Sequence, residues 1–393
     1  MGLFFDTPYN GDLLDPAVIA PPFVQNVEVR NPGFPNALLG ASGNPPQLAA
    51  VLLEYENLNW PSALQYHVAI QRAILPETVL TVSYNGMRAF HLVSRRELNT
   101  IISQTLPDGR TFYPANTTRQ NPRVGSMTLF ATDSKAWYDG LQMSVNRRLR
   151  HGFSLLGSYT FSKALEQAPA AISFTEVSGG PKIRMDSSNL AGDKGLGSFD
   201  VRHAVSASVL WEVPYRGRMP LLRGWSLSGF LTAAGGHPFT PLLSFNHSRS
   251  GVTGATATTV DRPNLKPGAS NNPRIGSPDK WYDPSAFELP QAGFFGNLGR
   301  NTITGPGLSS LDLAARKEFL LPRLPETVRL QLRVEVFNSL NHANFDLPGN
   351  AQNATSASFL FTDTSGRPNL GATRPIRTVT DARDIQFALR LVW

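Results

Sequence analysis

The last eleven residues, Arg383–Trp393, alternate apolar and polar side chains up to the final position, and this feature constrains the fold most. Side chains two residues apart point to the same side of a β-strand, so the segment predicts a strand with one apolar face. That face carries Ile385, Phe387, Leu389, Leu391 and Trp393, and the other carries Gln386, Ala388 and Arg390. Soluble domains usually end in frayed polar residues, so an apolar terminal strand requires an explanation from the rest of the chain.

The same alternation recurs along the chain, most clearly in Thr327–Phe337. One side of that segment is apolar from Val328 to Val336, and the other side carries Arg329, Gln331, Arg333 and Glu335. A helix would spread both sets around its surface. Further alternating segments are 141–149 and 153–161 (joined by a tight turn at Arg150–Gly152), 201–213 and 225–231, with weaker ones at Ala63–Ile74, Thr78–Phe90 and Leu308–Leu320. These are about nine strands, several of them near the ~9–11 residues of a transmembrane strand.

Connections between the predicted strands alternate between short and long. Short links join Ile74 to Thr78, Leu149 to Phe153, Val213 to Gly224 and Leu320 to Thr327, and long segments rich in Gly, Pro and Asn occupy 91–136, 164–198, 237–307 and 339–382. A compact soluble domain rarely carries several long structureless loops, whereas outer-membrane barrels combine short periplasmic turns with long extracellular loops. The pattern predicts an all-β, antiparallel transmembrane β-barrel from the outer membrane of a Gram-negative-type bacterium.

Barrel geometry assigns roles to the two faces. The terminal strand would run toward the periplasm, with Ile385, Phe387, Leu389 and Leu391 facing lipid and Trp393 in the interfacial aromatic girdle. The girdle would also include Phe153, Tyr159, Phe161, Trp211 and Trp225. Arg329, Gln331, Arg333 and Glu335 would face the lumen as a solvated wall. Alternating aromatic residues also occur in sandwich cores, so a secreted or surface β-sandwich adhesin with long binding loops is the alternative.

The strand count indicates part of a larger barrel. Nine strands would place the start of the first, near Ala63, on the extracellular side, with 1–62 mostly an extracellular loop. Bacterial barrels have even strand numbers, so a tenth strand is expected upstream, and "MGLFFD" at the N-terminus is the candidate. We therefore treat 1–393 as a single barrel segment of about 9–10 strands. The N-terminus has neither the charged nor the apolar region of a signal peptide.

Composition excludes several classes of function. The chain has no cysteine and a net charge of +7, but its basic residues are scattered singly or in pairs, so nucleic acid is not an expected partner. The seven histidines form no metal-ligand pattern, and neither a P-loop nor a nucleophile elbow occurs, so we expect no cofactor, metal or enzymatic activity. An enzyme built on a barrel wall would require a Ser/His or carboxylate pair that converges at one rim.

Several sequence blocks, in the same order, resemble the barrel half of Oar-like TonB-dependent transporters. They are "WYDGLQMSVNRRLRHGFSLLGSYTFSKALE", "FDVRHAVSASVLWEVPYRG", "LLRGWSLSGFLTAAGGHPFTP", "WYDPSAFELPQAGFFGNLGRNTITGPGLSSLDLAARKEF" and "LRVEVFNSLNHANFDLPG". The resemblance runs from about residue 3 to 393 and implies the C-terminal part of a large plugged barrel that takes up a large or scarce solute. It implies as partners outer-membrane lipid, the barrel-assembly machinery through the C-terminal strand, and the TonB complex through a plug region. The signal peptide, plug and TonB box of the family pattern are not found in this sequence.

Overall fold

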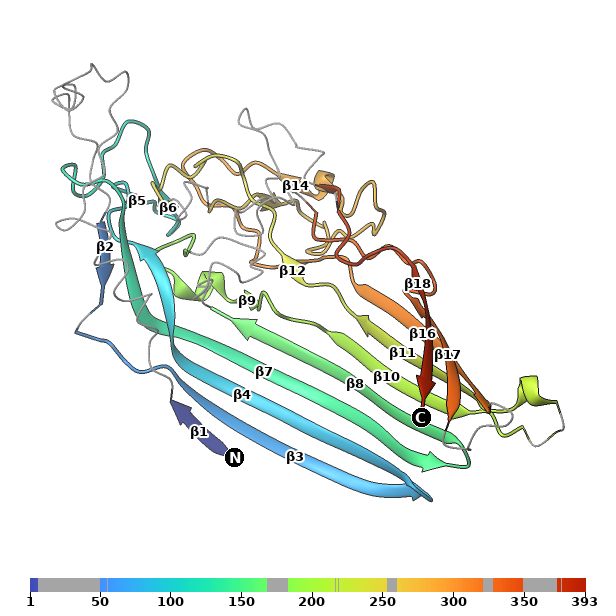
Figure 1. Ribbon diagram of the computed structural model, residues 1–393. Helices are drawn as coiled ribbons and strands as arrows, with labels where there is room; N and C mark the ends of the chain where they lie inside the picture. The colour runs from blue at the N-terminus through green and yellow to red at the C-terminus, as the bar shows by residue number, and fades with distance from the viewer. Residues whose placement is uncertain are drawn as a thin grey trace, which may run out of the picture.

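One large antiparallel sheet forms the body of the protein (Figure 1). The computed structural model describes residues 1–5, 50–54, 56–167, 183–215, 217, 219–252, 260–320, 328–348, 373–375 and 377–393. In spatial order the sheet contains β1 (Gly2–Phe5), β3 (Ser62–Leu75), β4 (Thr78–Glu97), β7 (Met127–Arg150), β8 (Phe153–Glu166), β10 (His203–Glu212), β11 (Trp225–Ala234), β16 (Leu308–Leu320), β17 (Arg329–Phe337) and β18 (Asp384–Val392). All the predicted strands are therefore confirmed. No helix within these residues is long and apolar enough to cross a membrane.

Long strands that are neighbours in the chain are also neighbours in the sheet, and their connections are short at one end only. The hairpin β3–β4 turns at Pro76-Glu77, and the hairpin β7–β8 turns at His151-Gly152. His151 (φ 51°) and Gly152 (φ 78°) both have left-handed backbone conformations, which match the twist of a two-residue hairpin. The longer connections therefore all lie at the other end of the sheet, as the alternation of link lengths predicts (Figure 1).

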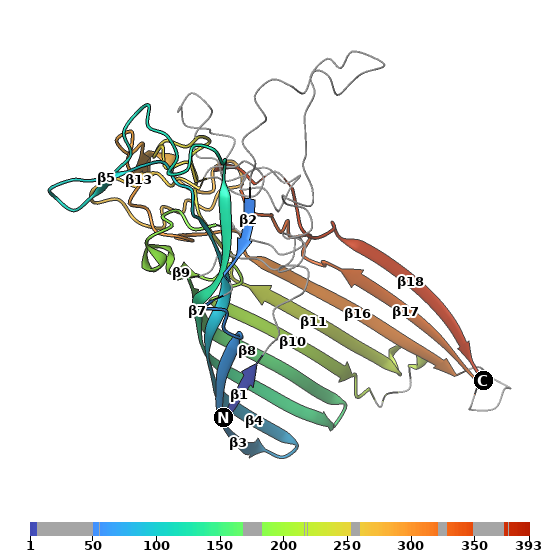
Figure 2. The same cartoon turned by 90° about the vertical axis from the view of Figure 1, so that its left-hand side faces the viewer.

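The short segment at the N-terminus is a strand, as predicted. β1 pairs antiparallel with β3, with Leu3 opposite Leu64 and Phe5 opposite Ser62. Among the described strands, β1 and β18 each have a neighbour on one side only, and they do not pair with each other. Figure 2 shows the sheet as a curved wall that is not closed.

Two strands extend well beyond their predicted ends. β4 has 20 residues and β7 has 24, so residues 91–97 and 127–136, expected as loop, continue the sheet. β2 (Ala50–Leu53) also lies within a predicted loop and pairs parallel with Met127–Phe130 of β7. These extensions lack a clean alternation because β-bulges interrupt the register between Ala89 and Ser94. A bulge shifts the side-chain parity, so a period of two does not detect the strand. Residues 6–49, the rest of the predicted N-terminal loop, lie outside the described residues.

The described parts of three long connections are packed rather than structureless. We use the name loop layer for the described parts of 98–126, 183–202 and 235–307. It contains the short strands β5 (Gln104–Thr105), β6 (Thr111–Phe112), β9 (Gly195–Leu196), β12 (Pro238–Phe239), β13 (Asn264–Leu265), β14 (Phe287–Glu288) and β15 (Ile303–Thr304) and the 3-10 helices η2 (Leu190–Asp193) and η4 (Pro284–Ala286). A third 3-10 helix, η3 (Pro220–Leu222), lies in the β10–β11 connection. β5 pairs β6, β12 pairs β15, β13 pairs β14, and β9 extends the large sheet at β8.

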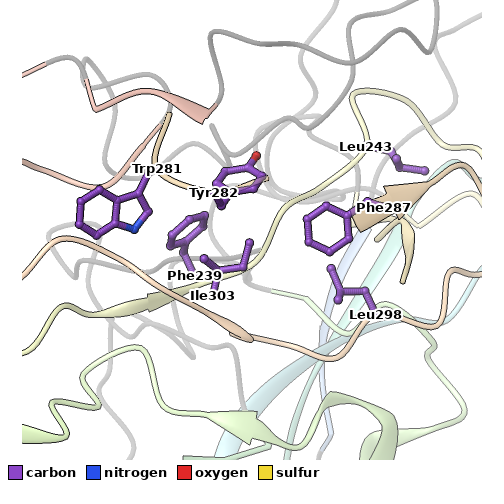
Figure 3. Packing of buried hydrophobic residues seen from close by; sticks show 7 residues of the cluster. All are labelled: Phe239, Leu243, Trp281, Tyr282, Phe287, Leu298 and Ile303. Atoms are coloured by element: carbon purple, nitrogen blue, oxygen red, sulfur yellow. The ribbon is translucent and has the colours of Figure 1, made fainter. Parts of the chain in front are cut away.

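The main hydrophobic core lies in the loop layer, not in the sheet (Figure 3). Its buried members are Phe239, Leu243, Trp281, Tyr282, Phe287, Leu298 and Ile303. The ring of Tyr282 packs edge-on against Phe239, with 5.7 Å between centroids, and the Trp281 indole donates to the Thr304 carbonyl at 2.8 Å. The prediction of structureless loops was therefore wrong for the described parts of 237–307, because their apolar residues follow no period and meet only in three dimensions.

Candidate functional site

The register of the large sheet gathers the apolar side chains of nine strands on one face. Directly opposed residues of antiparallel strands project to the same side, and each strand places its apolar set opposite the apolar set of its neighbour. For example, Val334 lies opposite Phe387 and Ala315 opposite Val334. The apolar face comprises Leu64, Tyr66, Val68 and Ile70 of β3; Leu80, Val82 and Tyr84 of β4; Trp137, Leu141, Met143 and Val145 of β7; Leu155, Tyr159 and Phe161 of β8; Val205, Ala207, Val209 and Trp211 of β10; Trp225, Leu227 and Leu231 of β11; Leu311, Leu313, Ala315 and Phe319 of β16; Leu330, Leu332, Val334 and Val336 of β17; and Ile385, Phe387, Leu389 and Leu391 of β18.

The opposite, polar face is lined mainly by Ser, Thr, Gln, Asn and charged residues. Ser158, Ser206 and Thr232 form a typical row across β8, β10 and β11. Exceptions include Val79, Met87, Leu156, Leu210 and Phe230, which share this face. The two faces thus differ in character along the sheet, with a few charged residues on the apolar face, among them Arg88, Asp139, Lys163 and Lys317.

The nine site residues predicted from sequence occupy the two faces as two separate sets. Ile385, Phe387, Leu389 and Leu391 continue the apolar face of β17, and Trp393, which follows β18, is 87% exposed. Arg329, Gln331, Arg333 and Glu335 lie together on the polar face. The Glu318 carboxylate accepts from Gln331 at 3.1 Å and from Arg329 at 3.5 Å, and Arg333 pairs with Glu335 at 2.6 Å. Such exposed pairs each contribute about 0–1 kcal/mol, so they keep the face polar more than they hold it together.

Aromatic side chains mark both ends of the apolar face. Phe153, Trp211, Trp225 and Phe319 lie near the turn end, and Tyr66, Trp137 and Phe161 lie nearer the loop end, whereas Tyr84 and Tyr159 lie between the two groups. Phe161 is eight residues from Phe153 on β8, which is about 27 Å along the strand at ~3.4 Å per residue. At a tilt of about 40° this corresponds to a height of roughly 21 Å, close to the ~25 Å apolar band of an outer-membrane barrel.

One lysine lies on the apolar face near the turn end. Lys317 is opposite Trp225, and only 2% of its surface is exposed. Its ammonium group donates to the Arg223 carbonyl and lies 5.0 Å from the ring centre of Phe319. A lysine whose stem packs under aromatic rings and whose charge reaches a backbone carbonyl at the strand end avoids an unpaired charge on an apolar surface.

The loop layer contacts the polar face of the sheet at the loop end of the strands. Glu166 of β8 belongs to the polar face, and its carboxylate pairs with Arg300. The Asn301 amide donates to the Leu196 carbonyl at 2.8 Å, and its backbone N–H donates to Thr240 at 2.7 Å. These contacts attach the segment 237–307 to β8 and β9, so the loop layer lies against the polar side of this rim.

Three buried ion pairs stabilise the loop layer, one within it and two that join it to β7 and β8. Arg184 pairs with Asp133, Arg262 with Asp193 and Arg300 with Glu166, and each guanidinium group is at most 5% exposed. Arg262 also donates to the Leu298 carbonyl at 3.2 Å. Burial lowers the pKa of Arg262, while the Asp193 carboxylate raises it. The sequence does not reveal these pairs, because their members are 51 to 134 residues apart and share no local pattern.

A buried carboxylate, Asp261, also lies in the loop layer. It accepts from the backbone N–H of Ser248 at 2.6 Å and from the Ser248 hydroxyl at 2.9 Å. Burial raises the pKa of Asp261 to about 6, against the lowering effect of both Ser248 donors. The Nε2 atom of the nearby His247 bonds the Pro290 carbonyl at 2.8 Å, so this serine and histidine are not arranged as a nucleophile and its base. Within the described residues, no group of three or more His, Asp or Glu side chains could hold a metal ion.

The titration of Asp261 predicts a pH dependence for the loop layer. A carboxyl group whose pKa is higher in the folded state than its ordinary value of 3.8 stabilises the fold below pH 4, and this contribution is lost as the pH rises through about 6. The change is at most about 3 kcal/mol. We expect the protection of Leu243, whose N–H donates to the Asp261 carbonyl, to increase from pH 7 to pH 4.5 relative to Asp261→Asn.

Hydrogen exchange of loop-layer peptides measures this change in protection. Because wild type and Asp261→Asn are compared at the same pH, the pH dependence of the intrinsic exchange rate cancels. If protection depended on pH in the same way in wild type and Asp261→Asn, the pH dependence would not be due to Asp261.

Comparison with known proteins places this two-faced wall in a family. The chain is similar to the outer-membrane transporter YddB from Escherichia coli (10% identity, TM-score 0.42, 88% of this chain and 34% of that chain). It is also similar to the ferripyoverdine receptor of Pseudomonas aeruginosa (12%, 0.38, 84% and 27%) and to the FrpB iron transporter from Neisseria meningitidis (9%, 0.36, 92% and 35%). The chain thus spans about a third of the length of these structures. Among curated proteins, no sequence matches it. The outer membrane β-barrel domain matches residues 1–386, so the chain belongs to this outer-membrane family.

Proposed function

We propose that the apolar face contacts outer-membrane lipid and that the polar face lines the lumen of a barrel. The observation that carries this proposal is the register, which aligns apolar side chains across nine strands. Water would have to cover this face in a soluble monomer, and exposed apolar patches of that extent are rare on such proteins. In a bilayer the same face meets hydrocarbon, and the polar groups of the backbone are satisfied within the sheet.

Single cysteines test this orientation directly, because the natural chain contains none. Phe387→Cys lies on the proposed lipid face and Gln386→Cys, the adjacent residue, on the proposed lumen face. In membranes we expect a charged, water-soluble maleimide to label Gln386→Cys at least tenfold faster than Phe387→Cys, since a thiolate forms poorly in hydrocarbon. Equal rates in membranes would contradict the assignment of faces, and equal rates after denaturation provide the control.

We further infer that the chain is the C-terminal barrel portion of an Oar-like, TonB-dependent transporter or receptor. Two observations support this proposal beside the sequence resemblance. β1 and β18 have free pairing edges among the described strands, and a sheet edge in a bilayer must be paired. Long strands connected by loops that fold inward at one rim suit a receptor whose loops bind a large or scarce solute at the mouth. Coupling to TonB would pass through a plug region outside the 393 residues.

The C-terminal strand is the proposed contact for the barrel-assembly machinery. β18 has one unpaired edge among the described strands, and its side chains are almost all exposed. An edge strand with free N–H and C=O groups can pair with a strand of another chain. Ile385, Phe387, Leu389, Leu391 and Trp393 would accompany that pairing on the lipid side.

The genomic DNA immediately upstream of the Met1 codon tests the transporter proposal. We expect an in-frame coding region for a signal peptide, a TonB box and a plug. A stop codon with no such region nearby would contradict coupling to TonB and would leave the lipid-facing wall unaffected. The β-sandwich adhesin has no support in the described residues, because no second large sheet covers the apolar face.

A further inference from the structure

Three cations gather at the loop end of the apolar face. Lys163 on β8 lies on this face, ten residues from the turn end of its strand at Phe153. The Lys194 ammonium lies 4.2 Å from the ring centre of Trp137, and the Arg202 guanidinium lies 5.8 Å from that of Phe161. Phe161 and Leu165, the residue opposite Trp137, flank Lys163 on the same face. Each is two residues away, which is about 7 Å along the strand. The three cations therefore form one group, which we call the cationic belt.

None of these three cations has an ion-pair partner within the described part of the chain. The nearest carboxylate in register is Asp139, which lies directly opposite Lys163. Its oxygens are already engaged by other donors. Arg88 donates to both oxygens, at 2.9 and 3.1 Å, and the Tyr84 hydroxyl donates at 2.6 Å. The charge of Asp139 is thus compensated by Arg88, and the belt keeps a surplus of three positive charges beside the aromatic rings of Trp137 and Phe161.

The position of the belt selects its ligand. It lies at the height where the proposed bilayer ends on the loop side, about 26 Å from the turn end after correction for strand tilt. Unpaired cations beside interfacial aromatic rings are suited to anionic headgroups, each cation contributing about fivefold in affinity. The aromatic rings of Trp137 and Phe161 would contact the adjoining acyl chains. A protein partner would need acidic groups that reach into the lipid boundary, which is less compatible with this location.

We propose that Lys163, Lys194 and Arg202 form a binding site for a phosphate-bearing lipid headgroup of the leaflet on the loop side. The inference rests on the proposed function, because it requires the apolar face to meet lipid. Three cations together would bind such a lipid roughly a hundredfold more tightly than a variant without them.

The test uses the chain extracted in mild detergent from outer membranes, with bis-phosphorylated lipid A as the probe. Native mass spectrometry counts bound lipid for wild type and for Lys163→Gln/Lys194→Gln/Arg202→Gln. The matched control is Arg316→Gln/Arg329→Gln/Arg333→Gln, which removes three cations from the polar face. We expect the belt variant to lose about a hundredfold in affinity and the control to retain wild-type affinity.

Each outcome decides a different point. Equal affinity of wild type and belt variant would overturn the proposal, as would equal binding of dephosphorylated lipid A. Full competition by millimolar inorganic phosphate would assign the belt to free phosphate and overturn the lipid. A heat-modifiable band on a gel reports the folded barrel. If that band is present in all three proteins, a negative binding result contradicts the lipid site alone. Its absence in wild type would count against the proposed function.

Discussion

Ala207→Arg should destabilise the folded protein in lipid bilayers by about 2–4 kcal/mol, whereas Ser206→Arg should change stability by about 1 kcal/mol or less. Ala207 lies on the apolar face, four residues from Trp211 near the turn end and four from His203 at the loop end. This places it near the middle of the proposed bilayer, where an arginine must abandon its hydration or distort the lipid. Ser206 is the neighbouring residue on the polar face, opposite Ser158 and Thr232.

Both replaced residues are small, so the two variants differ in the face that receives the charge and little in packing. Denaturant unfolding in vesicles, followed by tryptophan fluorescence, gives the two free energies of unfolding. Equal destabilisation by both substitutions, or a larger effect of Ser206→Arg, would contradict the proposed orientation of the sheet in the membrane.

Arg262→Met should cost the loop layer about 3–5 kcal/mol of stability, because it leaves a buried carboxylate without its cation. The side chains of Arg262 and Asp193 are 4% and 5% exposed, and Asp193 otherwise accepts from the Met185 backbone N–H at 3.1 Å. The double variant Arg262→Met/Asp193→Asn should recover most of the loss, since it removes the buried charge as well. Hydrogen exchange of loop-layer peptides measures the effect, and peptides from β10 and β11 report whether the sheet stays folded.

An exposed ion pair in the same layer provides the control. Lys280 and Asp283 lie 3.1 Å apart with side chains 46% and 40% exposed, so Lys280→Met should change protection by less than about 1 kcal/mol. Similar losses for Lys280→Met and Arg262→Met would show that the layer responds to any loss of charge and not to burial.

The sequence was sufficient to predict the long strands, because a two-residue alternation can be recognised from neighbouring residues alone. Val328, Leu330 and Leu332 indicate their common side without any knowledge of β16 or β18. The structure places Leu330 opposite Phe319 and Leu391, and Leu332 opposite Leu389. The short turns were equally local, since His151-Gly152 is a two-residue link between two such patterns. Even the four-residue strand β1 followed from an argument about strand number.

The sequence pattern does not predict the parts of the structure that depend on distant contacts. The upper part of β4 contains bulges and ends at Glu97, a buried carboxylate that accepts from the backbone N–H groups of Asn99 and Met127. A charged residue at a strand end resembles a loop in sequence, and Glu97 can be buried because these donors, the Ser126 hydroxyl and the Arg119 guanidinium compensate its charge. The cationic belt was missed for a related reason, because Lys194 and Arg202 lie in a connection that the fold returns to β7 and β8.

The sequence by itself determined which residues form strands, which parity of each strand is apolar and at which end the chain turns back sharply. Those properties depend on neighbours in the chain. The tertiary structure alone decided that the apolar parities of nine strands fall on one face, that the described parts of 237–307 pack around Phe239 and Tyr282, and that Arg300 reaches Glu166 across 134 residues. Register and long-range pairing depend on the free energy of the whole assembly, and no local period records them.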